Sequence, residues 1–147
     1  MNIHVNLDSD HYREMGSIAR ILHTRNDLRF HAQGLQKGQF VFLTRLCEQP
    51  GVTVVRLAKV ARVDQTTATK AVQKLEKAGY LTRIASADDG RSQTLWPTEK
   101  AKTSYLSIVT AENEDLAEGL AGFSDSEEEI LLSLLQSVRT NLERGKP

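Results

Sequence analysis

The feature that most constrains the fold is a pair of short helical patterns separated by a tight turn. Thr53 precedes the first pattern, which ends near Val60, and Asp64 precedes the second, which covers about residues 65–78. Thr and Asp side chains accept hydrogen bonds from the unpaired N–H groups of a first helical turn, so both residues are expected to cap helices. Gly79 suits the end of the second helix, where the backbone needs a positive φ. The residues expected to face the core are Val54, Leu57, Ala58, Ala68, Ala71, Val72 and Leu75.

After Gly79 the pattern changes from that of a helix to that of a strand. Residues 80–84 and 93–96 alternate β-forming and polar side chains, and residues 86–92 between them are rich in turn formers. This pattern predicts a β-hairpin with a loop longer than the tightest kind. Two short helices followed by a hairpin have the order of a winged helix-turn-helix. We therefore expect a mainly α fold with a small β-hairpin wing.

Amphipathic helices are also expected on both sides of this unit. They cover about residues 10–31 and 37–48 before it, a long stretch opening at Thr98, and a last stretch to about Arg144 that begins at a capping box of Ser124 and Glu127. These helices exceed what a small winged unit needs for its core, and their apolar faces must be covered. We expect a homodimer in which residues 1–34 and 103–147 form a helical dimerisation region and residues 35–102 form the winged helix-turn-helix domain.

The net charge of zero hides an uneven distribution. Residues 51–102 carry ten Lys or Arg against five Asp or Glu, a net charge of +5, whereas residues 103–147 carry three against nine, a net charge of −6. A basic middle segment indicates a local site for a polyanion such as duplex DNA. A solvated helical face would give the same imbalance, so charge alone leaves that alternative open.

The expected DNA site follows from the winged helix-turn-helix interpretation. The second short helix would enter the major groove with its N-terminal residues at base edges. The hairpin loop would bring Arg91 to the minor groove, with its guanidinium held by Asp89. Arg56 and Arg83 are expected at phosphates, as is Lys59. The candidate DNA-binding residues are Arg56, Gln65, Thr66, Thr67, Thr69, Lys70, Gln73, Lys74, Arg83, Asp89 and Arg91.

Several of these assignments have a purely structural alternative. Thr67 can simply support the first turn of its helix, and an Asp89–Arg91 ion pair can stabilise the loop alone. Lys74 and Lys77 can simply be solvated, which is the interpretation that we favour for Lys77.

Short motifs follow one another in a fixed order between Gln39 and Glu99. They are Thr53–Ala58, Val63–Val72, Leu75–Leu81, Asp89–Ser92 and Thr98–Lys100. In this order and spacing they resemble the MarR (multiple antibiotic resistance regulator) family. The resemblance implies a ligand-responsive homodimeric regulator of transcription, most often a repressor, that binds a pseudo-palindromic operator. Two positions depart from the family pattern, because Gly90 stands where a second basic residue is common and Ala101 where a glycine is common.

The resemblance also implies an effector pocket between the winged unit and the helical region. Tyr12, His23, Phe40 and Trp96 are the candidates to line it, and a phenolic or other aromatic compound is the expected effector. Plain core packing is the alternative for each of these four side chains. The alternative for the whole chain is an architectural or protein-interaction module without effector sensing.

The sequence holds no motif for catalysis, metal binding or a cofactor. No two of the four histidines are four residues apart, as in a helical zinc site. His23 and His31 could hold a regulatory metal with Cys47 or an acidic residue, but we interpret them as surface or pocket-lining residues and Cys47 as a core residue. We therefore expect no enzyme activity, no metal and no cofactor.

No apolar run approaches the ~18 residues of a membrane-spanning helix. Residues 1–11 also lack the basic and apolar regions of a signal peptide. We expect a cytoplasmic protein with no membrane partner.

Overall fold

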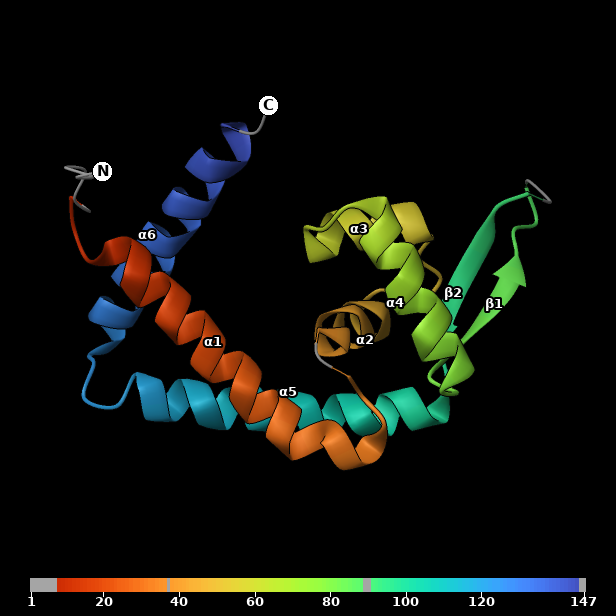
Figure 1. Ribbon diagram of the computed structural model, residues 1–147, viewed down its shortest axis with the longest axis horizontal. Helices are drawn as coiled ribbons and strands as arrows, with labels where there is room; N and C mark the ends of the chain where they lie inside the picture. The colour runs from red at the N-terminus through yellow and green to blue at the C-terminus, as the bar shows by residue number, and fades with distance from the viewer. Residues whose placement is uncertain (1–7, 37, 89–90, 146–147) are drawn as a thin grey trace, which may run out of the picture. The chain divides into compact units, whose positions relative to one another are not determined.

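The computed structural model describes residues 8–36, 38–88 and 91–145, and it confirms a mainly helical chain with a two-stranded antiparallel hairpin (Figure 1). In chain order the elements are α1 (His11–Phe30), the short 3-10 helix η1 (His31–Gln33), α2 (Gln39–Glu48), α3 (Val54–Ala61), α4 (Gln65–Lys77), β1 (Leu81–Ala85), β2 (Gln93–Pro97), α5 (Glu99–Gly119) and α6 (Asp125–Arg144). The chain divides into one compact part that ends at Ala111 and a second from Glu112 onward. The expected domain boundary at residues 102–103 falls inside α5.

The two short helices begin and end where their caps predict. The Thr53 hydroxyl accepts a hydrogen bond from the N–H of Arg56 at 3.2 Å, and Asp64 Oδ1 accepts one from the N–H of Thr67 at 2.7 Å. The turn between α3 and α4 places Arg62 at φ +57°, and Gly79 ends the second helix at φ +84°. The predicted helix-turn-helix is therefore confirmed.

The core of the winged unit is formed by one face of each of its helices. The predicted inward residues of α4 are all buried, and Leu57 and Ala58 of α3 are buried with them. Leu43 and Leu46 of α2 complete this layer. Removing such side chains from water contributes roughly 1.5–3 kcal/mol each. Figure 1 shows α2, α3 and α4 gathered beside the hairpin.

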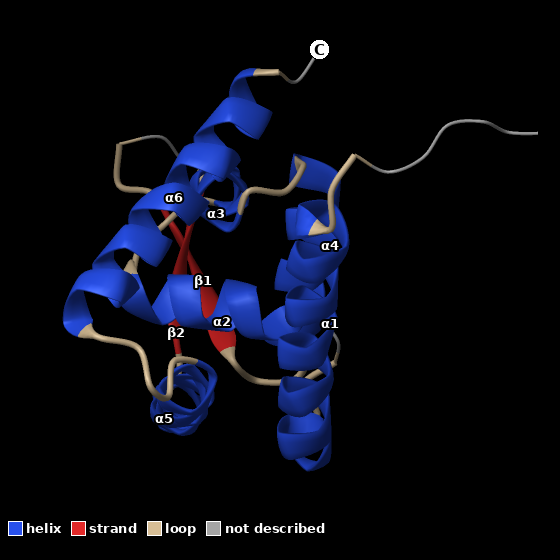
Figure 2. Cartoon of the chain, turned by 90° about the vertical axis from the view of Figure 1, so that its left-hand side faces the viewer, coloured by secondary structure: helices blue, strands red, loops and turns tan. Residues whose placement is uncertain are grey.

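The hairpin has a third, very short partner that the sequence pattern did not predict. Its strands pair from Leu81 opposite Pro97 to Ala85 opposite Gln93. On the other side of β2, Leu95 donates a hydrogen bond to the carbonyl of Val52 and accepts one from the N–H of Gly51, both at 2.8 Å. Figure 2 shows the paired strands in red. The bridge fixes the base of the hairpin to the segment that leads into α3.

The helices outside the winged unit keep much apolar surface exposed within one chain. On α1, Ile18 and Leu28 are 53% and 79% exposed. On α6, described by itself, Leu134 and Leu142 are 60% and 67% exposed. The predicted capping box is present, because Ser124 and Glu127 each accept a hydrogen bond from the other's backbone N–H.

Candidate nucleic-acid interface

α4 separates its side chains into a buried face and a polar exposed face. With 3.6 residues per turn, the buried side chains recur on one side and leave Thr66, Lys70, Gln73 and Lys77 along the opposite ridge. All four are exposed, whereas Thr69 is half-buried at the border. Gln65 and Lys74 are also exposed. Thirteen residues make a rod about 20 Å long, and the major groove admits a helix of this kind.

Asp64 organises the first turn of α4. Its carboxylate accepts both the backbone N–H of Thr67 and, through Oδ2 at 3.1 Å, the Thr67 hydroxyl. The backbone hydrogen bond, followed by that of the hydroxyl, lowers the pKa of Asp64 below its ordinary value. The Thr67 hydroxyl is thus engaged within the protein, which matches the structural alternative for this residue.

Further candidate basic residues lie on neighbouring elements. Arg56 and Lys59 are exposed on α3. Arg91 is exposed shortly before β2. Asp89 lies outside the described residues, as does its expected pairing with Arg91.

Arg83 has a partner that the sequence analysis missed. Its Nε donates to Glu76 Oε2 at 3.0 Å, and its Nη1 lies 3.5 Å from the amide oxygen of Gln93. One guanidinium therefore connects the last turn of α4 with both strands of the hairpin. Its expected role at a phosphate competes with these contacts.

Residues at the start of α5 hold the C-terminal end of α4. The Lys100 ammonium donates to the carbonyl of Ala78 at 2.6 Å, and the Thr98 hydroxyl donates to that of Gly79 at 2.7 Å. A cation at this helix end also interacts favourably with the helix dipole. The same ammonium lies 4.4 Å from the centroid of the Tyr80 ring. These contacts connect the end of α4 with the start of α5.

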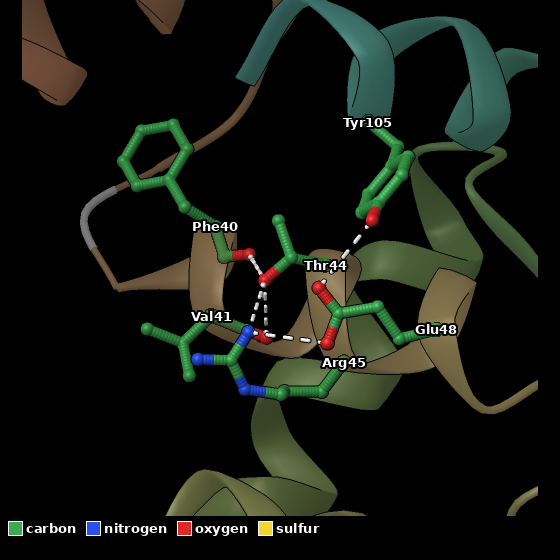
Figure 3. A network of polar contacts seen from close by, with 6 residues as sticks. All are labelled: Phe40, Val41, Thr44, Arg45, Glu48 and Tyr105. Carbon is green, nitrogen blue, oxygen red and sulfur yellow. Dashed lines mark hydrogen bonds and ion pairs between the residues drawn. The ribbon is translucent and has the colours of Figure 1, made fainter. Parts of the chain in front are cut away.

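A network of polar contacts joins α2 to α5 (Figure 3). The buried Thr44 hydroxyl donates to the carbonyl of Phe40 and accepts from Arg45 Nη1 at 3.3 Å. Arg45 also pairs with Glu48, and the Tyr105 hydroxyl of α5 lies 3.5 Å from the other oxygen of that carboxylate. The winged unit is thus connected by polar contacts to the first part of α5.

The four residues expected at an effector pocket lie in different surroundings. Tyr12 and His23 are exposed on α1, eleven residues and thus about 16 Å apart along the helix axis. Phe40 is buried, with its ring centroid 5.7 Å from that of Phe30. Trp96 is 40% exposed and lies over the backbone of Gly51. For Phe40, these surroundings match the core-packing alternative.

No group of three or more metal-ligating side chains occurs among the described residues. Burial, aided by the negative charge of Glu48 and opposed by Lys102, raises the pKa of Cys47 to about 11. A thiol with this pKa stays protonated at neutral pH and is a poor nucleophile and metal ligand. None of the described helices is long and apolar enough to cross a membrane.

Comparison with known proteins finds a matching family and structures of the same fold. The model of a family described as "MarR family" matches residues 35–93. The uncharacterized HTH-type transcriptional regulator YybA of Bacillus subtilis is 37% identical over 137 residues, which cover 92% of this chain and 91% of that protein. The structure of a MarR protein from Peptoclostridium difficile is similar at 40% identity, with a TM-score of 0.89 and coverage of 98% and 94%. The structure of a putative MarR family regulator from Listeria monocytogenes, complexed with 26mer DNA, is 31% identical, with a TM-score of 0.86 and coverage of 95% and 97%.

Proposed function

Since the chain belongs to the MarR family of transcriptional regulators, we propose that it binds a pseudo-palindromic operator in duplex DNA as a homodimer. We propose further that it is a repressor and that it leaves the operator when a small molecule binds. The observation that carries the proposal is the ridge of Thr66, Lys70 and Gln73 on a helix whose opposite face is fully buried. The DNA complex of the Listeria relative supports the same use of the fold here.

The side chains of α4 and the hairpin have the chemistry for DNA. Amide and hydroxyl groups such as those of Gln65, Thr66 and Gln73 can donate to and accept from base edges in the major groove. Lys70 supplies a positive charge for a base or a phosphate, and Arg91 can enter a narrow minor groove. The exposed Arg56 on α3 adds a phosphate contact, which positions the protein on DNA without reading its sequence.

The exposed apolar side chains of α1 and α6 support a homodimer. A soluble chain rarely leaves contiguous leucine and isoleucine faces in water unless a partner covers them. A second copy of the chain is the most economical partner, because two-fold symmetry gives two copies of α4 for two half-sites. Such half-sites are separated by about one helical turn of DNA, or a multiple of it.

The proposal of a small-molecule effector rests on membership of the MarR family, and the candidates to line its pocket are Tyr12, His23, Phe40 and Trp96. Phe40 is closed inside the core, so an aromatic effector would reach it only if the Phe30–Phe40 contact opened. Such an opening would move α2 relative to η1 and α1. An effector would then act by changing the separation of the two DNA-reading units.

The first experiment is selection of bound duplexes from random DNA, followed by competition in a gel shift. A specific regulator yields one pseudo-palindromic sequence that random DNA competes poorly. Absence of specific binding even at low salt would contradict the proposal and favour an architectural or protein-contact module. Replacing Arg91 by Ala should weaken specific binding and leave the oligomeric state unchanged, and equal affinity would refute its minor-groove role.

Effector response is tested separately on the complex with the selected operator. Phenolic compounds, zinc and peroxide are added in turn, and release of the labelled duplex is measured. Release by a phenolic compound at a concentration that leaves the protein folded supports ligand response. A complex that none of the three disturbs would leave the DNA-binding role intact and count against this choice of effector.

A further inference from the structure

We propose that Glu76 and Arg83 form a clamp that positions the hairpin relative to α4 and thereby sets the preference for specific over random DNA. The inference rests on the proposed DNA-binding function and adds two positioning residues to it. Neither residue needs to touch a base for the clamp to act.

The clamp joins three elements through one side chain. Arg83 stands opposite Leu95 in the hairpin register, and Leu95 is fully buried. Because residues opposite each other in an antiparallel pair point to the same side of the sheet, Arg83 leaves β1 on the side that faces the helices. There its Nε meets Glu76 at 3.0 Å, while Nη1 approaches Gln93 at the start of β2. A shift of the hairpin against α4 would break the contact with Glu76, whereas the contact with Gln93 lies within the hairpin and orients the guanidinium.

The clamp closes across the turn where the chain reverses. Gly79, with φ +84°, is the left-handed residue between α4 and β1. A glycine turn does not by itself fix the angle between strand and helix. The bridge from Leu95 to Gly51 and Val52 holds the base of the hairpin, and the ion pair adds the direct contact between β1 and α4. The ion pair spans this turn from Glu76 to Arg83. It also lies partly out of water, since the side chains are 41% and 26% exposed.

Specific and random DNA make different demands on this geometry. Binding to random DNA needs little more than positive charge near phosphates. Binding to a specific site needs α4 at base edges and the hairpin at the neighbouring minor groove at the same time. A hairpin that is already held in place avoids an ordering cost on binding. Loss of the clamp should therefore weaken specific binding and spare random binding.

If charge alone mattered, Glu76→Gln would change the affinity for specific DNA in the opposite direction. If Arg83 only contacts phosphate and Glu76 only repels it, then Glu76→Gln removes a negative charge and frees a guanidinium. Affinity for specific and random duplexes would then rise together. The clamp predicts instead that Glu76→Gln lowers affinity for the specific duplex.

The test measures dissociation constants of the full chain for the selected operator and for a random duplex over a range of salt. The clamp variants are Glu76→Gln, Arg83→Gln, their combination, and the exchanged pair Glu76→Arg with Arg83→Glu. Glu143→Gln is the matched control, because Glu143 forms a 3.0 Å ion pair of similar exposure with Arg139 on α6. Circular dichroism and thermal unfolding check that every variant is folded.

The clamp predicts that each single neutral variant loses about fivefold in specific affinity, the upper size expected for an exposed ion pair. In Glu76→Gln the affinity for random DNA is unchanged or higher. The affinity of the double variant for the specific duplex is no worse than that of either single variant. The exchanged pair regains most of the specific-to-random ratio, and the control keeps the ratio of the parent. The slope of log affinity against log salt stays the same in Arg83→Gln, whereas loss of a phosphate contact would reduce it by about 0.9.

Three results would overturn the clamp. They are a parallel rise of both affinities in Glu76→Gln, a reduced salt slope in Arg83→Gln, or an exchanged pair that stays as weak as the single variants. If single variants do not fold, the exchanged pair alone decides. Failure of the parent to prefer any duplex would contradict the proposed function itself and is seen before any variant is made.

Discussion

The Tyr80 hydroxyl donates a hydrogen bond to the backbone carbonyl of Gln33, forty-seven residues earlier in the chain. Tyr80 immediately follows the glycine that ends α4, and its ring is buried at 1% exposure. Gln33 ends η1, the short helix that follows α1. This contact joins the helix proposed to read DNA to the segment that leads out of the N-terminal helix.

Replacing Tyr80 by Phe should lower the free energy of unfolding by about 1 kcal/mol, because one partly buried hydrogen bond is lost while the ring remains. Urea unfolding measures this difference. Tyr12→Phe is the control, since Tyr12 is 76% exposed and should leave stability unchanged. Equal stabilities of Tyr80→Phe and the parent would show that the hydrogen bond contributes nothing net.

Removal of the Asp64 cap should loosen the first turn of α4. Asp64→Ala is expected to lower the thermal midpoint by a few degrees and to weaken DNA binding, whereas Asp64→Asn keeps an acceptor and stays close to the parent. Ser124→Ala removes the equivalent cap of α6 and should lower the midpoint without changing affinity measured for the assembled dimer. If Asp64→Ala binds DNA with the affinity of the parent, the cap does not contribute to DNA binding.

Acid should weaken the same cap, because protonation of Asp64 removes its stabilising contribution. The pKa of Asp64 is lower in the folded chain than its ordinary value of 3.8, so its stabilising contribution is complete above that value. The contribution is lost as the pH falls through the lowered pKa. The thermal midpoint of the parent should therefore fall more steeply below about pH 4 than that of Asp64→Asn. Identical acid profiles would contradict the assignment.

Two lysines of α4 should differ although both are exposed. Lys70→Ala is expected to reduce DNA affinity and, if the contact is to phosphate, to lower the salt slope by about one. Lys77→Ala, near the end of the same helix, should change little. Fluorescence anisotropy with labelled operator measures both. Equal losses for the two variants would mean that only the overall charge of the helix matters.

Gly51 should be less tolerant of a side chain than Gly34, although both have positive φ. A Cβ at Gly51 would lie 3.0 Å from Cζ2 of Trp96, whereas a Cβ at Gly34 meets nothing within 4 Å. Gly34→Ala should cost about 1 kcal/mol of backbone strain, and Gly51→Ala should cost more and shift the emission of Trp96, the single tryptophan. A parental emission spectrum in Gly51→Ala would contradict this packing.

Cys47 should be unreactive in the folded protein. Its pKa of about 11, against an ordinary 9.0, reduces the thiolate fraction at neutral pH about 100-fold. Reaction with a thiol reagent should be slower by that order than in urea at the same pH. Cys47→Ser should bind the operator equally well with and without peroxide. Rapid labelling of the native protein would contradict this burial of the thiol.

The parts of the fold that sequence predicts are those set by local rules. Asp64 and Gly79 define the ends of α4 through hydrogen bonds and backbone conformation within a few residues, and helical periodicity identifies its buried side. The alternation of β-forming and polar residues that predicts the hairpin is also a local sequence pattern. Local rules are therefore sufficient to predict the exposed ridge of α4, which carries most of the candidate DNA site.

The remaining contacts join separate elements, and no helical or strand periodicity in the sequence predicts them. Arg83 meets Glu76 across the change from helix to strand at Gly79, so neither a helical nor a strand spacing predicts the pair. The Val52 bridge and the Tyr80–Gln33 hydrogen bond depend on how distant segments pack. Trp96 has an aromatic side chain that suits a pocket, but its position over Gly51 depends on the bridge between distant segments.

The most direct test of the central claim is the stoichiometry of the complex with the selected operator. Sedimentation equilibrium of a labelled duplex, with protein in moderate excess at physiological salt, gives the number of chains bound. Two copies of the chain on each pseudo-palindromic duplex, with no comparable complex on a random duplex of equal length, is the predicted result. A single bound copy, or equal loading of both duplexes, would contradict a dimeric, sequence-specific regulator.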